Sequence, residues 1–77
     1  MRELTPMTAE QSFFAVFCIE ALADALQTTG DEVYVRITDK SDILDEYIIP
    51  NYGVLHTQGR DYIVNELTSI MQKHGVA

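Results

Sequence analysis

The chain is poor in the residues that most catalytic and metal sites need. Its 77 residues include one cysteine, two histidines, two prolines and no tryptophan. A single thiol, Cys18, can form neither an intrachain disulfide nor a cysteine-rich zinc site. His56 and His74 lie far apart, and neither has a second histidine or a cysteine one helical turn away. A serine or cysteine triad, a phosphate-binding loop and a dinucleotide fingerprint are also absent, so no catalytic residue, metal or cofactor is predicted.

Positive charge is scarce as well. Five basic residues stand against twelve acidic ones, for a net charge of −7. Nucleic-acid affinity depends on clustered Lys and Arg that neutralise phosphates, and the basic residues here are scattered. This distribution argues against binding to nucleic acid or to an anionic membrane, and leaves a DNA-binding regulator as a distant third hypothesis. A charged partner is expected to be basic.

Long apolar runs are missing too. The longest extends only from Phe13 to Ile19, far short of the ~20 residues that span a bilayer. No signal peptide is recognisable at the N-terminus, so we expect a soluble cytoplasmic protein. The length predicts a single small domain over residues 1–77, with residues 1–7 a loose lead-in. A core of this size gains stability most readily from a partner subunit, which makes a homodimer a reasonable expectation.

What remains is typical of helices. Thr8 and Gln11 have capping-box spacing, Pro50 should stop or kink a helix at Ile49, and Gly59 should provide a left-handed helix end. Ser41 is a suitable N-cap for a helix beginning at Asp42. We therefore predict an all-α fold, a compact array of four to five short helices at about 8–28, 30–39, 42–49, 50–58 and 60–74.

The segment from Val33 to Thr38 is ambiguous. Its β-branched residues nearly alternate with polar ones, which favours a strand, yet no other segment offers a convincing partner strand. As a helix, the segment would begin at a capping box of Thr29 and Glu32, with Val33, Tyr34 and Ile37 on one face. The pattern by itself leaves both possibilities open.

The first predicted helix is apolar on too many sides. Phe14, Cys18, Leu22 and Ala25 form the stripe expected in the core, where Cys18 is a small buried hydrophobe. The opposite side carries exposed carboxylates, Glu20 and Asp24, which we take to be solvated. Three large apolar residues fall on or beside that wet side: Phe13, Val16 and Phe17. We expect them to lie under another helix of the chain or of a dimer mate, or else to cap the edge of the core.

Polar side chains accumulate at a second place, around His56, one of the two histidines. The candidate polar site comprises Tyr52, His56, Thr57, Gln58 and Tyr62. In the simpler interpretation His56 ends a helix and bonds to a neighbouring backbone or hydroxyl group. In the other, the cluster is a pocket in which His56 titrates near neutral pH and contacts a ligand.

Three stretches together resemble a family of small bacterial proteins of unknown function. They are Phe17-Cys18-Ile19-Glu20, the run from Tyr47 to Tyr52, and Leu55 to Gly59 followed by Tyr62-Ile63-Val64. The resemblance covers about Phe13 to Gly75. It implies an all-helical fold, with residues 33–38 helical, and brings no activity, cofactor or catalytic residue. Because such genes often adjoin one whose product resembles an ADP-ribosyltransferase, the resemblance also implies an accessory or antitoxin-like role.

No specific function follows from the residues alone. The leading hypothesis is a small acidic regulatory module that binds a protein, either itself or the product of a neighbouring gene, through Phe13, Val16 and Phe17. The alternative is a small ligand-binding or enzymatic domain centred on His56. A pocket beside His56 would favour the second, and exposure of the phenylalanines the first.

Overall fold

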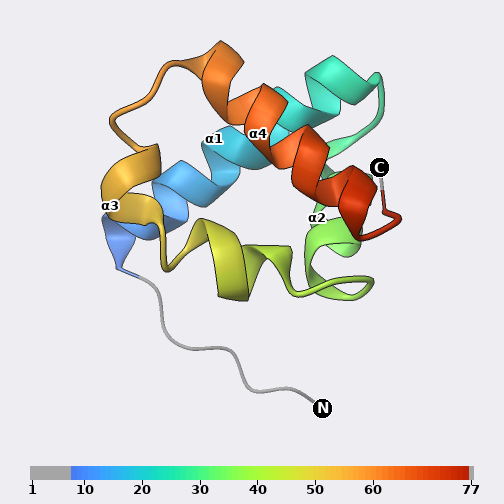
Figure 1. Cartoon of the computed structure of the whole chain (residues 1–77), viewed down its shortest axis with the longest axis horizontal. Coiled ribbons are helices and arrows are strands. Elements are labelled where there is room, and N and C mark those ends of the chain that lie inside the picture. The colour runs from blue at the N-terminus through green and yellow to red at the C-terminus, as the bar shows by residue number, and fades with distance from the viewer. Residues whose placement is uncertain (1–7, 77) are drawn as a thin grey trace.

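The computed structural model describes residues 8–76, which form helices joined by short turns and include no strand (Figure 1). The all-α prediction is therefore correct. The predicted loose lead-in, residues 1–7, lies outside the described residues. The elements in chain order are α1 (Ala9–Leu26), α2 (Gly30–Thr38), the π-helical turn η1 (Leu44–Ile48), α3 (Tyr52–Leu55) and α4 (Arg60–Lys73).

The ends of α1 are set by hydrogen bonds to its backbone. The Gln11 N–H donates to the Thr8 hydroxyl at 3.1 Å, and the Thr8 N–H donates to the Gln11 side-chain oxygen at 3.0 Å. This is the predicted capping box, which satisfies backbone donors that have no partner inside the helix. At the other end Gln27 adopts a left-handed backbone, with φ 56°, and its N–H caps the Ala23 and Asp24 carbonyls. The helix thus ends at Leu26 and not at the predicted Thr28.

One apolar cluster joins all five elements. Helix α1 packs against both α2 and α4, and α4 crosses in front of α1 in Figure 1. Among residues 8–76 every buried position is apolar or is Cys18. The predicted stripe of α1 is mostly correct, because Phe14, Cys18 and Leu22 are buried, but Ala25 is exposed. The cluster consists of Phe14, Ala15, Cys18, Leu22, Ala23, Val33, Ile37, Ile43, Leu44, Ile48, Leu55, Ile63, Leu67 and Met71.

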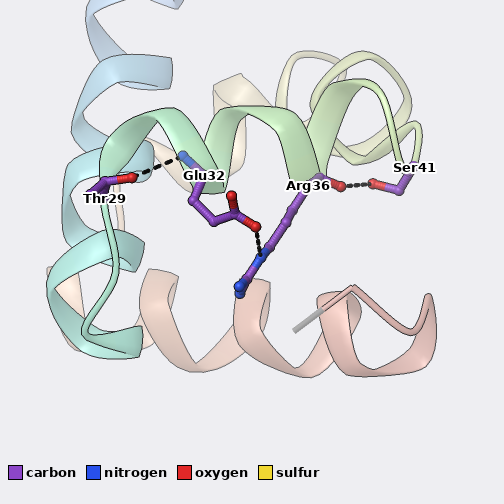
Figure 2. Close-up of polar contacts among 4 residues, drawn as sticks. All are labelled: Thr29, Glu32, Arg36 and Ser41. Carbon is purple, nitrogen blue, oxygen red and sulfur yellow. Dashed lines mark hydrogen bonds and ion pairs between the residues drawn. The ribbon is translucent and has the colours of Figure 1, made fainter.

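The strand-like segment is the helix α2, held by local polar contacts that Figure 2 shows. The Thr29 hydroxyl accepts from the Glu32 N–H at 3.2 Å, and the Arg36 Nε–H donates to the Glu32 carboxylate at 3.2 Å. The Ser41 hydroxyl then donates to the Arg36 carbonyl at 2.7 Å, closing the last turn. Because the Glu32 side chain pairs with Arg36, only the Thr29 half of the expected capping box is observed.

Burial decides the conformation of this segment. Val33 and Ile37, one turn apart, are fully buried against the core. Val35, which a strand would place on the same face, is only partly buried, as the helical period requires. Tyr34 does not share that face as predicted, since 46% of it is exposed. A side-chain cap stabilises a helix by about 1 kcal/mol, and an (i, i+4) ion pair by about 0.2–0.5 kcal/mol. Burying a Val or Ile side chain contributes about 1.5–3 kcal/mol. Burial of the two aliphatic residues therefore stabilises α2 more than its polar contacts do.

Pro50 shapes the turn that precedes it. The Ile49 N–H bonds to the Leu44 carbonyl at 3.0 Å, a bond spanning five residues that defines the π-helical turn. Proline has no N–H to give to the Glu46 carbonyl, and in a regular α-helix its ring would clash with that carbonyl. The predicted break at Ile49 is therefore correct, although the helix before it is shorter than 42–49 and has π geometry.

The predicted helix over 50–58 is wrong in extent, because only Tyr52–Leu55 is helical. Asn51 has no side-chain cap bond, and Gly53 lies within the single turn, so both weaken the helix. Beyond Leu55 the backbone forms turn bonds, among them the Gln58 N–H to the Leu55 carbonyl at 3.0 Å. Gly59 is not the left-handed end of this helix. It has extended geometry, φ −74° and ψ 164°, and is the N-cap of α4. The last helix, predicted over 60–74, ends at Lys73, and Gly75 two residues later has a left-handed φ of 71°.

Gly53 and Gly75 allow a matched test of the backbone geometry. A Cβ added at Gly53 meets no atom within 4 Å. Gly53→Ala is therefore expected to stabilise the protein by about 0.4–1 kcal/mol, by restricting the unfolded chain. Gly75→Ala is expected to destabilise it by about 1–2 kcal/mol, because alanine is strained in a left-handed backbone. Urea unfolding followed by circular dichroism measures both, and destabilisation by Gly53→Ala would contradict the open position.

Within residues 8–76 no single helix has both the length and the apolar content needed to cross a bilayer. Helices α1 and α2 pass that test only as a pair, and they are bent by 112° relative to each other.

Candidate functional site

The exposed face of α1 carries three large apolar side chains. Phe13 is 76% exposed, Val16 53% and Phe17 40%. The three are spaced one, three and four residues apart on a regular helix, so they project from one side of it. We call these three residues the α1 patch. The opposite side of α1 buries Phe14 and Leu22 in the core.

No helix within residues 8–76 buries the α1 patch, so the described part of the chain does not supply the expected cover. A cover from a dimer mate stays a prediction. Phe17 meets the edge of the core, where its ring stacks on Phe14 with centroids 6.2 Å apart and planes inclined by 27°. This contact fits the simpler expectation of an edge residue, but only for Phe17. Phe13 and Val16 are the more exposed members, and their exposure needs another explanation.

A hollow of about 600 Å³ adjoins the patch. Its lining combines apolar and charged groups from α1, α2, α4 and the turn between the first two: Phe17, Glu20, Ala21, Ala23, Asp24, Thr28, Gly30 and Arg60. The Arg60 guanidinium donates to the Asp24 carboxylate at 3.1 Å. Glu20 and Asp24 are exposed, as the sequence suggested, but they also line the same hollow as Phe17.

Sequence reasoning missed the contribution of Arg60. It lies 36 residues from Asp24, and α4 brings it to this position only because that helix packs on α1. No local spacing signal could have paired the two residues. Val54 was also missed, although its 64% exposure on the short α3 makes it a further exposed apolar side chain.

Four of the five residues of the candidate polar site lie together, on α3 and the turn that follows it. The imidazole of His56 stacks on Tyr52 with centroids 4.5 Å apart and planes 6° from parallel. Its Nδ1 lies 2.7 Å from the Tyr52 carbonyl, a contact in which the Nδ1–H donates. The Thr57 hydroxyl donates to the Val54 carbonyl at 2.7 Å, and Gln58 donates to Thr57 at 3.4 Å. These bonds are local and close the end of the helix, the simpler of the two roles considered.

Tyr62, the fifth member, is exposed on α4, and Tyr47 lies on η1. Burial raises the pKa of Tyr47, and the nearby charge of Glu66 raises it further. The Tyr47 hydroxyl donates to the Glu66 carboxylate at 3.4 Å. These groups border a second hollow of about 440 Å³ between η1 and α4. His56 lines neither this hollow nor the one beside Phe17.

A row of rings connects the polar cluster to the α1 patch. Phe14 packs edge-on against Tyr52, with centroids 5.5 Å apart and an angle of 81°, and it also stacks with Phe17. Figure 1 accordingly shows α3 beside the N-terminal part of α1. The two candidate sites identified from sequence are thus neighbours, and the Tyr52–His56 pair supports the helix that carries the patch.

Cys18 has the structural role that the sequence indicated. It is fully buried, and burial raises the pKa of its thiol to about 12. A nucleophilic cysteine needs the opposite shift, toward the thiolate. Within the described part of the chain, His, Cys, Asp and Glu form no group of three or more that could hold a metal ion.

A family model described as "protein of unknown function (DUF3791)" matches residues 13–74. The chain belongs to the DUF3791 family. The match spans all five helices, nearly from end to end, and all three stretches on which the resemblance was based. The match agrees with the expected resemblance to a family of unknown function, and the description of DUF3791 names no activity. No curated protein and no solved structure matches the chain.

Proposed function

We propose that this DUF3791 protein is a protein-binding module whose contact surface is the α1 patch. The observation that carries the proposal is the exposure of Phe13, Val16 and Phe17 on one side of one helix. Clustered, exposed large apolar residues on a small domain mark interaction sites, whereas isolated ones are ordinary. Aromatic side chains are also enriched among the residues that dominate binding energies.

The occupant we propose is a different protein and not a second copy of this chain. Every copy carries a net charge of −7, and Glu20 and Asp24 stand directly beside the patch. Pairing two such surfaces would bring carboxylates together at the rim, and like charges placed face to face oppose association. The family resemblance makes the product of a neighbouring gene the first candidate, in the cytoplasm of a bacterium. In that setting the protein would act by occluding or stabilising its partner, with no chemistry of its own.

The double variant Phe13→Ser/Phe17→Ser tests this role. Phe13 is largely exposed, so Phe13→Ser should change stability by less than about 0.5 kcal/mol. Phe17 is only 40% exposed and stacks on Phe14, so Phe17→Ser should cost about 1–2 kcal/mol, and circular dichroism checks that the double variant stays helical. Co-purification of the neighbouring gene product with the wild-type protein is expected, and the double variant should lose it. Because hot-spot aromatic residues each account for about 2 kcal/mol or more, binding should weaken by over an order of magnitude.

Tyr34→Ser supplies the control, since Tyr34 is exposed to a similar degree on α2, outside the patch. It should leave binding unchanged. Retention of the partner by the double variant would contradict the proposal. A second contradicting result would be a wild-type protein that is a stable dimer and a double variant that is a monomer, both measured by light scattering.

A further inference from the structure

The α1 patch is the centre of a longer stripe. Along the exposed side of α1 lie Glu10, Phe13, Phe17, Glu20 and Asp24, spaced alternately by three and four residues, and all are exposed. This is the spacing of a coiled-coil seam, which keeps residues aligned along one side of a helix. At 1.5 Å per residue the stripe is about 21 Å long. Its middle is apolar, and both of its ends are acidic.

The stripe has no positive charge of its own. Residues 9–26 contain neither Lys nor Arg. The nearest cation that the structure places there is Arg60 of α4, which bonds to Asp24 beside the hollow. That pair shows that a guanidinium fits at this end of the stripe. Glu20 has no comparable partner among the described residues, and it lines the same hollow as Phe17.

From this arrangement we infer that the partner contributes a cationic amphipathic helix, which lies along α1. Two apolar side chains one turn apart contact Phe13 and Phe17. About one turn before and one turn after these apolar residues, the partner helix carries Lys or Arg. At one end they face Glu10, and at the other they face Glu20 and Asp24, where a long basic side chain enters the hollow. The inference rests on the proposed protein-binding function and adds the chemical class of the partner.

The same stripe disfavours a second copy as the occupant. In an antiparallel pair centred on Phe17, Glu10 of one chain faces Asp24 of the other, and Phe13 faces Glu20. In a parallel pair each carboxylate faces itself. Both arrangements place a carboxylate against another carboxylate or against an aromatic ring. A partner helix with basic residues at both ends instead meets an opposite charge at each end of the stripe.

Selection from a displayed library of random peptides of about 18 residues, long enough for five helical turns, tests the inference. The full chain is the bait at low ionic strength. We expect the enriched peptides to carry paired apolar residues flanked by Lys or Arg. The best peptide is then synthesised, together with a version in which Glu replaces every basic residue, and the dissociation constants are measured by fluorescence anisotropy.

For the basic peptide, Glu10→Lys/Glu20→Lys should weaken binding at least about tenfold, because like charges then face each other across the interface. Raising the salt from low to molar levels should weaken binding of the wild-type protein by a similar factor, because salt screens the attraction. The same variant should gain affinity for the Glu-containing peptide. Asp39→Lys is the charge control, since it adds a positive charge at the exposed end of α2, and it should lower the affinity less than about twofold.

The outcomes separate the two proposals. If enriched peptides depend on Phe13 and Phe17 but carry no basic residues, the binding function stands and the cationic partner is wrong. If binding is insensitive to Phe13→Ser/Phe17→Ser, or if no peptide is enriched, both are wrong. Self-association of the wild-type chain that Glu10→Lys/Glu20→Lys strengthens would overturn the inference in favour of a second copy.

Discussion

Leu22→Ala is expected to destabilise the protein by about 2–5 kcal/mol, the range for deleting a buried leucine side chain. Leu22 is fully buried in the middle of α1, the helix that packs against both α2 and α4. Domains of this length are stable by about 0.05–0.15 kcal/mol per residue, so the loss is a large part of the total. Urea unfolding should show a much lower midpoint, and a substantial unfolded fraction at physiological temperature.

Two control variants distinguish the destabilisation caused by a cavity from that caused by any substitution of Leu22 or any loss of apolar atoms. Leu22→Met keeps most of the volume and should cost less than about 1.5 kcal/mol. Val54→Ala removes apolar atoms from an exposed position and should change stability by less than about 0.5 kcal/mol. A small effect of Leu22→Ala, equal to that of Val54→Ala, would contradict the position of Leu22 at the centre of the core.

Cys18 is expected to react with thiol reagents far more slowly in the folded protein than in urea. Burial raises the pKa of the thiol from its ordinary 9.0 to about 12, and the thiolate is the reactive form. At about pH 8 that shift alone lowers the thiolate fraction on the order of 10³-fold, and burial also blocks access of the reagent. Mass spectrometry after timed alkylation gives both rates. Equal rates would show that Cys18 is accessible.

The same pKa shift predicts how stability depends on pH. Between about pH 9 and pH 12 the unfolded thiol loses its proton while the folded thiol keeps it, so ionisation favours the unfolded chain. Stability should therefore fall as pH rises above about 9, and Cys18 should contribute no pH dependence near neutrality. Comparing urea midpoints of wild type and Cys18→Ala from about pH 7 to pH 10.5 isolates the contribution of this thiol, because the other titrating groups are shared. Parallel pH profiles would contradict a buried thiol.

The sequence predicted which residues make up the candidate sites, but not how those residues are covered or paired in the fold. Helical spacing placed Phe13, Val16 and Phe17 on one side of α1, and the acidic neighbours on the same side. It could not tell whether another helix covers them, because that depends on where the later helices pack. Arg60 could not be associated with Asp24 for the same reason. The polar side chains around His56 were found by composition, but their bonds proved to be local to α3.

Local rules worked where the chain makes its own contacts. The Thr8–Gln11 capping box and the break at Pro50 both follow from groups a few residues apart. They failed where several weak signals compete, as at Gly59 and along residues 50–58. There the outcome depends on how a short turn is held between η1 and α4, and local propensities of a few tenths of a kcal/mol do not decide it.

By itself, then, the sequence determined that this protein is an acidic, mostly helical chain with an apolar stripe for the core and a second apolar group left over on α1. Those properties are set by residue type and by the 3.6-residue period of a helix. Only the tertiary structure decided that residues 33–38 are helical, that the α1 patch stays uncovered, and that Arg60 joins Glu20 and Asp24 beside Phe17. The physical reason is that burial is shared between segments distant in sequence, and no segment carries that information alone.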